Sequence, residues 1–276
     1  MFRALMPFEE YKKFERAVEL LSRFRGVAVA FSGGVDSTLA LLAAVKAVGE
    51  HRVIALTALM PISVPGEVEG ARGVADWLGV KHRVIEVDVL KIPEVRRNHE
   101  DRCYYCKKAI YEALSSHAGR EGFEVLIDGS LKEDFEVDRP GIKAAREVGV
   151  LSPLAEAGVC KEDARRLLKF FNAPNAEKPP ESCLATRIPF GVELTERRLK
   201  MVAHLEAAVK NLAGVRLVRA RWRGENEAVL EVLAEEIVKL LENREDVVKA
   251  AEEIGFERVS VDLRGYVPEK LRSRAL

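Results

Sequence analysis

The stretch that decides the fold is VAVAFSGGVDST, residues 27–38. Its first four residues form an apolar run that predicts a buried strand, and LALLAAVKAV (39–48) directly after it has the composition of a helix. Between them stand two glycines, an acid and small hydroxyl residues. Glycine lets backbone N–H groups approach an anion, and a helix N-terminus favours negative charge. The stretch therefore predicts a strand, a phosphate-binding loop and a helix.

The type of phosphate loop follows from the motifs that are present and absent. The sequence has no G-x-x-x-x-G-K-[ST], which excludes the lysine-bearing P-loop, and no G-x-G-x-x-G, which excludes the dinucleotide fingerprint. S-G-G-x-D-S instead resembles the PP-loop of the ATP pyrophosphatase superfamily, whose members cleave ATP between the α and β phosphates. A carboxylate and a phosphate repel each other, so Asp36 requires Mg²⁺ between them. The candidate ATP-binding residues are Ser32, Gly33, Gly34, Asp36, Ser37 and Thr38.

Strands alternate with helices on both sides of this loop, which predicts βαβ units and a parallel sheet. We expect strands over 27–31, 52–59, 82–89 and 123–129, and helices over 8–24, 37–48, 67–78, 106–117 and 161–171. The fold class is therefore α/β, an adenine nucleotide α-hydrolase-like parallel sheet with helices on both faces. Ligands bind at the carboxyl ends of such strands. Gly129 and the polar segment 130–141, with Lys132, Asp134, Asp138 and Arg139, are thus expected at one cleft with the PP-loop, where Asp128 or Asp134 would help to position magnesium or ATP.

The pattern changes after residue 190. A helix over 195–212, strands over 215–222 and 227–233, a helix over 234–254 and a strand over 258–263 predict a small α+β domain. We therefore expect a PP-loop domain over 1–190 and a C-terminal domain over 191–276, joined by the proline-rich stretch that ends in SCLATRIPFG (182–191).

Composition sets broad limits. The chain has 276 residues, 48% of them hydrophobic and 32% charged, which is typical of a globular protein. Its 44 basic residues balance 44 acidic ones, so overall charge gives no argument for nucleic acid. We find no signal peptide and no apolar run long enough to span a membrane. A cytoplasmic location is expected, with the four cysteines as reduced thiols.

Two cysteines, Cys103 and Cys106, stand three residues apart in RCYYCKK (102–108). A lone CxxC is compatible with half a zinc site, a redox pair, part of an iron–sulfur cluster, or two core cysteines. The absence of a second CxxC weakens structural zinc. Cys183 could add a third thiolate, and three thiolates leave one iron of a [4Fe-4S] cluster open for a sulfur atom or a substrate. Cys160 is interpreted as a packing residue.

Six motifs in order extend the resemblance over nearly the whole chain: SGGVDST, YYCKK, DGSLKEDFEVDRPG, SCLATRIPFG, VRARW and VDLRGY. Together they resemble the LarE family, PP-loop ATP-dependent sulfur transferases of nickel-pincer nucleotide biosynthesis. The resemblance implies a PP-loop domain followed by a small C-terminal domain. It also implies a homo-oligomer, and a hexamer is described for the best-known type.

The reaction that the resemblance implies has two parts. ATP adenylates a carboxylate of pyridinium-3,5-biscarboxylic acid mononucleotide with release of pyrophosphate, and a sulfur nucleophile then displaces AMP to give a thiocarboxylate. In one branch of the family the sulfur comes from the enzyme's own cysteine, at the position of Ser182 here. A shift of one residue in the alignment would make Cys183 that donor.

This chain departs from that branch, since it carries Cys103, Cys106 and Cys183 and looks like the branch whose [4Fe-4S] cluster receives external sulfide or another sulfur donor. The resemblance implies catalytic roles for Asp36, Lys107, Cys183, Arg187 and Glu206, and binding of the substrate phosphate or carboxylate by Arg187, Arg219 and Arg221.

Three other functions fit parts of the sequence. A tRNA-thiolating PP-loop enzyme would share the ATP and cluster chemistry, but it needs an RNA-binding surface that the balanced charge does not indicate. An ammonia-using amidotransferase or synthetase would leave the cysteines without a role. A nucleotide-binding regulatory module with structural zinc would lack catalysis altogether.

Overall fold

The computed structural model describes residues 8–136, 140–179, 181–224 and 226–267. They divide into two compact units. Unit 1 runs to Val95 and from Asp101 to Glu181, and unit 2 consists of Arg96–Glu100 and the residues from Ser182 onward. The domain boundary at residue 190 stays a prediction. Asp138 and Arg139, expected over the cleft, lie outside the described residues.

The core of unit 1 is a parallel sheet, as predicted. Its four strands are β1 (Val27–Ala30), β2 (Val53–Leu59), β3 (Lys81–Glu86) and β4 (Val125–Ile127), in the order β3-β2-β1-β4. Leu151 adds an isolated parallel bridge to Ile127. Strands β2 and β3 are therefore added on one side of β1, and β4 is added on its other side. The strand order reverses between β1 and β4, and we call this place the reversal point of the sheet.

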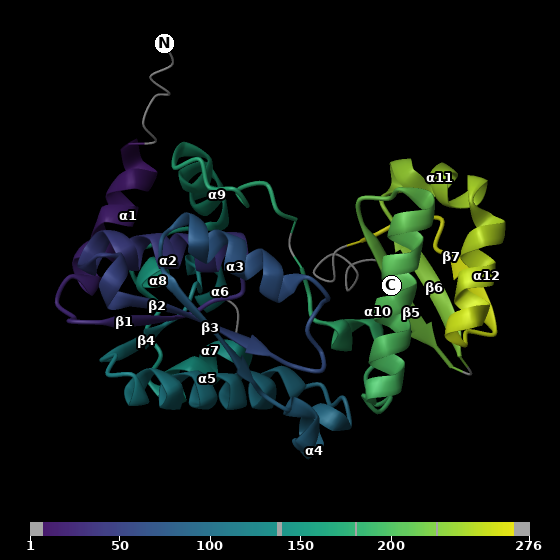
Figure 1. The fold of residues 1–276 in the computed structure, drawn as a ribbon, viewed down its shortest axis with the longest axis horizontal. Coiled ribbons are helices and arrows are strands. Elements are labelled where there is room, and N and C mark those ends of the chain that lie inside the picture. The colour runs from purple at the N-terminus through teal and green to yellow at the C-terminus, as the bar shows by residue number, and fades with distance from the viewer. Residues whose placement is uncertain (1–7, 137–139, 180, 225, 268–276) are drawn as a thin grey trace, which may run out of the picture. The chain divides into compact units, whose positions relative to one another are not determined.

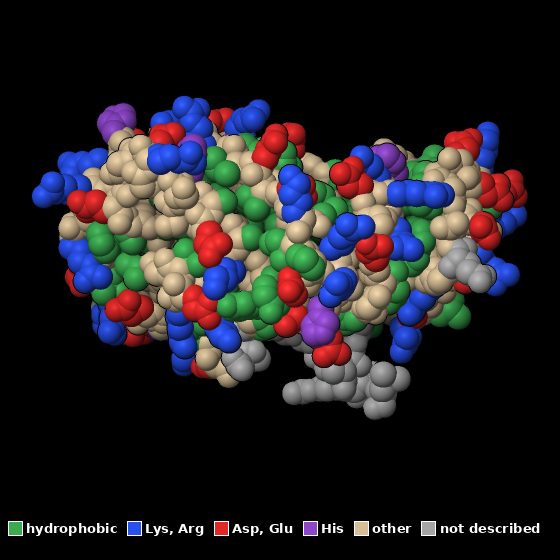
Figure 2. All heavy atoms as spheres, turned by 90° about the horizontal axis from the view of Figure 1, so that it is seen from below, with side chains coloured by type: hydrophobic (Ala, Val, Ile, Leu, Met, Phe, Trp, Pro, Cys, Tyr) green, Lys and Arg blue, Asp and Glu red, His purple; other side chains and the backbone are tan. Residues whose placement is uncertain are grey.

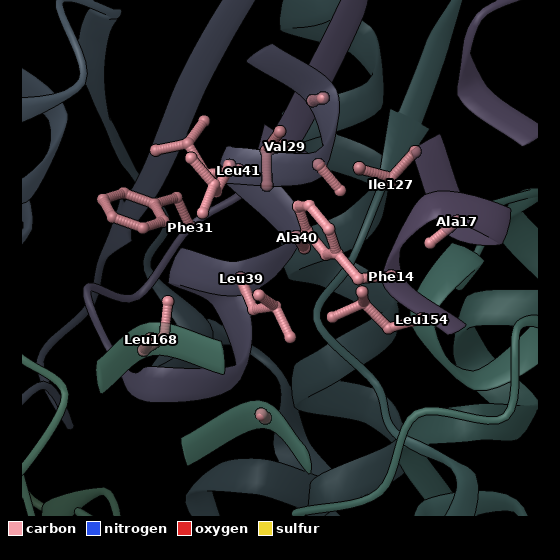
Figure 3. Close-up of a cluster of buried hydrophobic side chains, with 14 of the residues drawn as sticks. Phe14, Ala17, Val29, Phe31, Leu39, Ala40, Leu41, Ile127, Leu154 and Leu168 are labelled. Carbon is pink, nitrogen blue, oxygen red and sulfur yellow. The ribbon is translucent and has the colours of Figure 1, made fainter. Parts of the chain in front are cut away.

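Helices cover both faces of this sheet (Figure 1). Successive strand residues point to opposite faces, so Val27 and Val29 join one apolar cluster while Ala28 joins the other. Figure 3 shows Val29 in the first cluster with Phe14 and Leu39. The helices of that face are α1 (Phe8–Leu21), α2 (Val35–Val48), α3 (Glu67–Trp77), α8 (Pro153–Glu156) and α9 (Lys161–Phe170), and those of the other face are α5 (Arg102–Arg120) and α7 (Pro140–Val148).

Four helices of unit 1, α4 (Pro93–Arg96), α6 (Lys132–Phe135), α7 and α8, were not predicted from the sequence. The segment 130–141, expected as a loop, contains α6 and the start of α7, and α8 follows. The carboxylate of Asp134 accepts a hydrogen bond from the backbone N–H of Leu131 at 3.1 Å, which caps the first turn of α6. The short helix α4 comes before α5, and α5 itself begins at Arg102, four residues earlier than expected.

Unit 2 is a three-stranded sheet with helices. Its elements are α10 (Glu196–Ala213), β5 (Val218–Arg223), β6 (Glu227–Val232), α11 (Ile237–Glu242), α12 (Arg244–Ile254) and β7 (Arg258–Val261). Strand β6 pairs antiparallel with β5 and parallel with β7. The prediction of one helix over 234–254 was wrong. Asn243 adopts φ −106° and ψ 21° and interrupts it, while its side chain donates to the carbonyl of Lys239 at 2.8 Å.

A short excursion of the chain completes unit 2. Residues Arg96–Glu100 leave unit 1 and pair with the stretch that precedes α10. Asn98 is completely buried with φ +57°, and its side-chain amide donates to the carbonyls of Ile188 and Pro189 at 3.2 and 2.7 Å. Leu194 donates to the carbonyl of Arg96 at 2.7 Å. This long-range pairing holds the chain that follows Cys183.

The surface carries both charges side by side. On the face shown in Figure 2, Lys and Arg side chains are intermixed with Asp and Glu side chains over each unit. Within the described ranges, no helix is both long and apolar enough to cross a membrane.

Candidate active site

The PP-loop joins β1 to α2 and is shaped by hydroxyl groups. Ser32 Oγ lies 3.2 Å from Ser37 Oγ and accepts a hydrogen bond from the N–H of Gly34 at 3.3 Å. Ser37 Oγ also contacts the N–H of Ser32 and the carbonyl of Gly34. Ser32 is exposed, whereas Ser37 and Thr38 are buried. The two serines therefore hold the loop closed on itself, and Ser32 is the exposed hydroxyl.

Two glycines let backbones meet around this loop. Gly33 has φ +68°, and a Cβ there would come 2.8 Å from the Cα of Ala71 on α3. A Cβ on Gly129, just after β4, would lie 2.6 Å from the nitrogen of Ser37. No side chain fits at either position. Gly129 thus brings the carboxyl end of β4 against the PP-loop at the reversal point of the sheet, where open α/β sheets bind ligands.

The start of α2 offers an anion site with a carboxylate beside it. The N-cap, Gly34, has no side chain to satisfy the first backbone N–H groups of the helix, which can therefore serve an anion. Asp36 lies in the first turn. Burial raises the pKa of its carboxyl group, and the charges of Asp134 and Glu133 act in the same direction while Lys161 opposes them. A desolvated carboxylate next to a phosphate cradle matches the oxygen ligands that Mg²⁺ prefers.

Side chains from distant elements brace the loop. Thr57 Oγ1 on β2 donates to the carbonyl of Phe31 at 2.7 Å, so it must accept from His82 Nε2, 2.8 Å away. Burial, with the charge of Arg72, lowers the pKa of His82, which favours the neutral ring. On the other side, Asn175 Nδ2 donates to the carbonyl of Gly33 at 2.9 Å and to Thr38 Oγ1 at 2.8 Å.

Asp128, at the end of β4, organises the neighbouring loops. Its carboxylate accepts hydrogen bonds from the hydroxyls of Tyr111, Ser130 and Ser152 at 2.7–2.8 Å and from the N–H of Ser130 at 3.0 Å. Burial and the charge of Asp128 raise the pKa of Tyr111, whose phenol stays a donor. The contacts of Asp128 therefore support a structural role at the carboxyl end of β4. Asp134, the other residue considered for magnesium, caps α6 and lies 3.7 Å from Lys161 Nζ.

The CxxC pair lies at the beginning of α5. Cys103 is exposed and Cys106 half-buried, and none of the four cysteines, all of which the structure describes, is in a disulfide. Lys107 is exposed, and its Nζ lies 5.5 Å from the centre of the Tyr111 ring. Burial raises the pKa of Glu67 in α3, and the charges of Lys178 and Lys107 oppose this shift. Helix α3 follows the carboxyl end of β2, and α5 follows β3 by way of α4.

Cys183 belongs to unit 2 and precedes a short 3₁₀ helix, Leu184–Arg187. Arg187, which is 1% exposed, fixes this turn. Its Nε and Nη2 donate to the two carboxylate oxygens of Glu206 at 2.8 and 3.1 Å. Its Nη1 lies 2.8–3.1 Å from the carbonyls of Ser182 and Cys183 and from the hydroxyls of Ser182 and Thr186. Arg187 therefore holds the backbone on both sides of the Ser182–Cys183 peptide bond.

Arg219 and Arg221 lie two residues apart on β5, hence on one face of its sheet. Both are buried. Arg221 donates to Glu231 at 3.1 Å and to the carbonyl of Thr186 at 2.7 Å. Arg219 donates to the carbonyl of Val218 at 3.0 Å and lies 5.7 Å from the ring centre of Tyr266. Arg221 thus joins Arg187 in holding the turn after Cys183.

Among the described residues, no three His, Cys, Asp or Glu side chains are grouped as a metal site would require. The structure brings together the PP-loop with Gly129 in unit 1, and Cys183, Arg187, Glu206 and Arg221 in unit 2. Sequence reasoning missed Thr57, His82, Asn175 and Glu231. Thr57 carries a usable signal, a hydroxyl in the buried strand VIALTAL (53–59), but no local pattern connects Asn175 with a loop some 140 residues earlier.

In a comparison with protein families, residues 9–103 match the family model of NAD synthase. This range contains the PP-loop and the first three strands of the sheet, and it agrees with the α/β fold of unit 1.

Several relatives match over most of the chain. The pyridinium-3,5-bisthiocarboxylic acid mononucleotide synthase of Lactiplantibacillus plantarum is 32% identical over 249 residues, which are 90% of this chain and 90% of the relative. An uncharacterised protein of Synechocystis is 35% identical over 93% of this chain and 97% of its own length. Another, from Methanocaldococcus jannaschii, is 30% identical over 87% of this chain and 90% of its own length.

Proposed function

The chain belongs to the LarE family of ATP-dependent sulfurtransferases, and from this membership we propose that it converts pyridinium-3,5-biscarboxylic acid mononucleotide to a thiocarboxylate for nickel-pincer nucleotide biosynthesis. The observation that carries the ATP-dependent part is the contact between Gly129 and the PP-loop at the reversal point of the sheet. A phosphate-binding site formed there by the backbones of the PP-loop and of Gly129 fits a nucleoside triphosphate.

The carboxylate of the substrate attacks the α phosphorus of ATP and pyrophosphate leaves. Backbone N–H groups at the start of α2 stabilise the charge on the phosphates, and the hydroxyl of Ser32 adds a donor. Asp36 would hold Mg²⁺, which neutralises charge on the leaving pyrophosphate. A sulfur nucleophile then adds to the carbonyl carbon of the acyl-adenylate, and AMP departs with the electron pair of the cleaved C–O bond.

The roles of the unit 2 residues are part of the proposal. Arg219 and Arg221 are assigned, with Arg187, to the phosphate or carboxylate of the substrate. Lys107 of unit 1 is assigned a catalytic role. Arg187 and Glu206 are assigned to the catalytic centre through the turn that carries Cys183, because their hydrogen bonds connect this turn to α10 and β5. Planar guanidinium groups suit both tasks, since they bind oxygen pairs side by side.

We further propose that Cys103, Cys106 and Cys183 bind a [4Fe-4S] cluster. The chemistry of the donors fits, since thiolates are the usual cluster ligands and none of these cysteines is in a disulfide. A cluster held by three thiolates offers its fourth iron to an external sulfur donor. Such a cluster requires a reducing compartment, and we propose the cytoplasm. We also propose that the protein is a homo-oligomer, which sedimentation velocity would test.

The function is tested by incubating the anaerobically purified protein with ATP, Mg²⁺, a sulfide donor and the pyridinium nucleotide. We expect pyrophosphate and AMP in equal amounts, together with a nucleotide whose mass has changed by exchange of one oxygen for sulfur. The matched control replaces sulfide with ammonia, because residues 9–103 match the model of NAD synthase and ammonia is the nucleophile of the amidotransferase alternative. A carboxamide product that forms only with ammonia would contradict sulfur transfer and support an amidotransferase.

The sulfur route is tested by iron and acid-labile sulfide analysis of the same preparation. We expect about four irons and four sulfides per chain, both lost in Cys103→Ala, because a cluster tolerates no missing thiolate in a three-cysteine set. Cys160→Ala is the control, since Cys160 caps α9 and is not among the proposed ligands. An iron-free protein whose Cys183 loses its sulfur during the reaction would contradict the cluster and show self-sacrifice.

A further inference from the structure

Asn175 lies in the segment after α9, far in sequence from the PP-loop that it contacts. Its neighbours Ala173 and Ala176 are buried in the main apolar cluster of unit 1. Ala173 also donates to the carbonyl of Leu168 at 2.9 Å. The segment is therefore seated firmly on the unit that holds the PP-loop, and the Asn175 side chain is held in place before any ligand binds.

We propose that Asn175 is a positioning residue for ATP: it fixes the orientation of the Gly33–Gly34 peptide, and through the N–H of Gly34 it fixes the hydroxyl of Ser32, the exposed donor proposed for the phosphates. The side-chain amide donates to the carbonyl of Gly33 at 2.9 Å. In a trans peptide the carbonyl and the following N–H point in opposite directions. Anchoring the Gly33 oxygen on one side thus directs the Gly34 N–H to the other side, where Ser32 Oγ accepts it.

The need for an anchor follows from the two glycines. A peptide between glycines meets little steric resistance to rotation, because both residues tolerate positive and negative φ. Gly33 adopts φ +68° here. A second hydrogen bond, from the same amide to Thr38 Oγ1 at 2.8 Å, connects the loop to the first turns of α2. Asn175 therefore secures the loop and the helix start against each other.

The orientation of the amide is set by these acceptors. Nδ2 faces two oxygens, whereas Oδ1 is buried and has no hydrogen-bond partner among the described residues. Turning the amide over would place Oδ1 against the carbonyl oxygen of Gly33, an acceptor against an acceptor. The position thus requires a donor, and aspartate, which has the same shape, cannot replace asparagine.

This inference rests on the proposed function, because it assumes that the PP-loop binds ATP. Loss of two hydrogen bonds at a half-buried side chain is expected to raise the KM for ATP about 10- to 100-fold in Asn175→Ala. The kcat at saturating ATP and the KM for the pyridinium nucleotide should change little, since Asn175 touches no reacting group. A merely structural role would lower the melting temperature and the active fraction without this separation.

The experiment measures KM for ATP, kcat, the Kd for ATP by calorimetry, and melting temperature. Asn175→Asp keeps the shape and removes the donor, and Asn172→Asp makes the same change at an exposed position three residues away with φ +55°. We expect weakened ATP binding in both Asn175 variants and wild-type values in Asn172→Asp. If Asn175→Ala does not fold at the assay temperature, Asn175→Asp decides.

The two hypotheses fail differently. Wild-type protein that neither binds ATP nor releases pyrophosphate would overturn the proposed function. If the wild-type protein binds ATP and both Asn175 variants have a KM and a Kd for ATP within twofold of the wild-type values, only the positioning role is overturned. A parallel loss of kcat and melting temperature with unchanged KM would also overturn it, since that pattern is structural.

Discussion

Asp36→Asn is expected to abolish pyrophosphate release, with a fall in rate of at least about 10²–10³-fold, the usual size of losing a charge-stabilising group. Asp36 stands in the first turn of α2 beside the phosphate cradle, and its carboxylate is the group there that can carry Mg²⁺. An amide of the same shape keeps the loop intact and loses the charge. The assay is initial-rate pyrophosphate release at saturating ATP.

The same substitution is expected to leave the protein without ligands at least as stable. Burial raises the pKa of Asp36 above its ordinary 3.8, so the folded state binds the proton more tightly than the unfolded state. The ionised carboxylate therefore costs stability at neutral pH, and this cost disappears as the pH falls through the folded pKa towards 3.8. The melting temperature of Asp36→Asn should exceed that of the wild type at pH 7, and the difference should shrink in acid.

Asp76→Asn is the matched control, since Asp76 is exposed on α3. It should change neither activity nor the melting temperature appreciably. Full pyrophosphate release by Asp36→Asn would refute the role of the PP-loop carboxylate. A lower melting temperature of Asp36→Asn at pH 7 would refute the desolvation argument. The two tests are independent, because stability is measured without ligands and activity with them.

Arg187→Ala is expected to produce the largest loss of stability. Removing one partner of a buried ion pair costs about 3–5 kcal/mol, since the other charge remains uncompensated. Arg187 and Glu206 are nearly inaccessible, at 0% and 7% side-chain exposure, and the variant would leave Glu206 with the N–H of Ala220 as its neighbour. The turn around Cys183 loses its anchor as well, so sulfur transfer should disappear even below the unfolding temperature.

Urea unfolding followed by tryptophan fluorescence measures this effect. Trp222 is buried in unit 2 and Trp77 is exposed in unit 1, so a Trp77→Phe background isolates unit 2. Lys200→Ala removes an exposed ion pair with Glu196 on α10 and serves as the control. Arg187→Lys, which keeps the charge without the planar fork, should fall between the two. An unchanged urea midpoint in Arg187→Ala would contradict the anchoring role.

Local sequence patterns predicted much of the fold because the relevant forces are local. Alternating apolar runs predicted all four strands of the unit 1 sheet, and helical periodicity predicted α1, α2, α3 and α9 within a few residues. The break at Asn243 and the helices α4, α6, α7 and α8 escaped prediction. Helices of four residues, as α4, α6 and α8 are, have no periodicity to detect, and the turn-rich sequence before Gly141 hid the start of α7. The charged sequence around Asn243 continues a helical pattern on both sides.

The sequence by itself determined the phosphate loop, the parallel sheet and the identity of the candidate cysteines, since glycine, acid and thiol chemistry is carried by residue types in a short order. Only the tertiary structure decided that Gly129 contacts Ser37 and that Asn175 anchors Gly33. It also decided that the guanidinium group of Arg187 binds Glu206 and the turn at Cys183. These contacts join residues far apart in the chain. Their partners are selected by packing and by the need to satisfy buried polar groups, which no local pattern records.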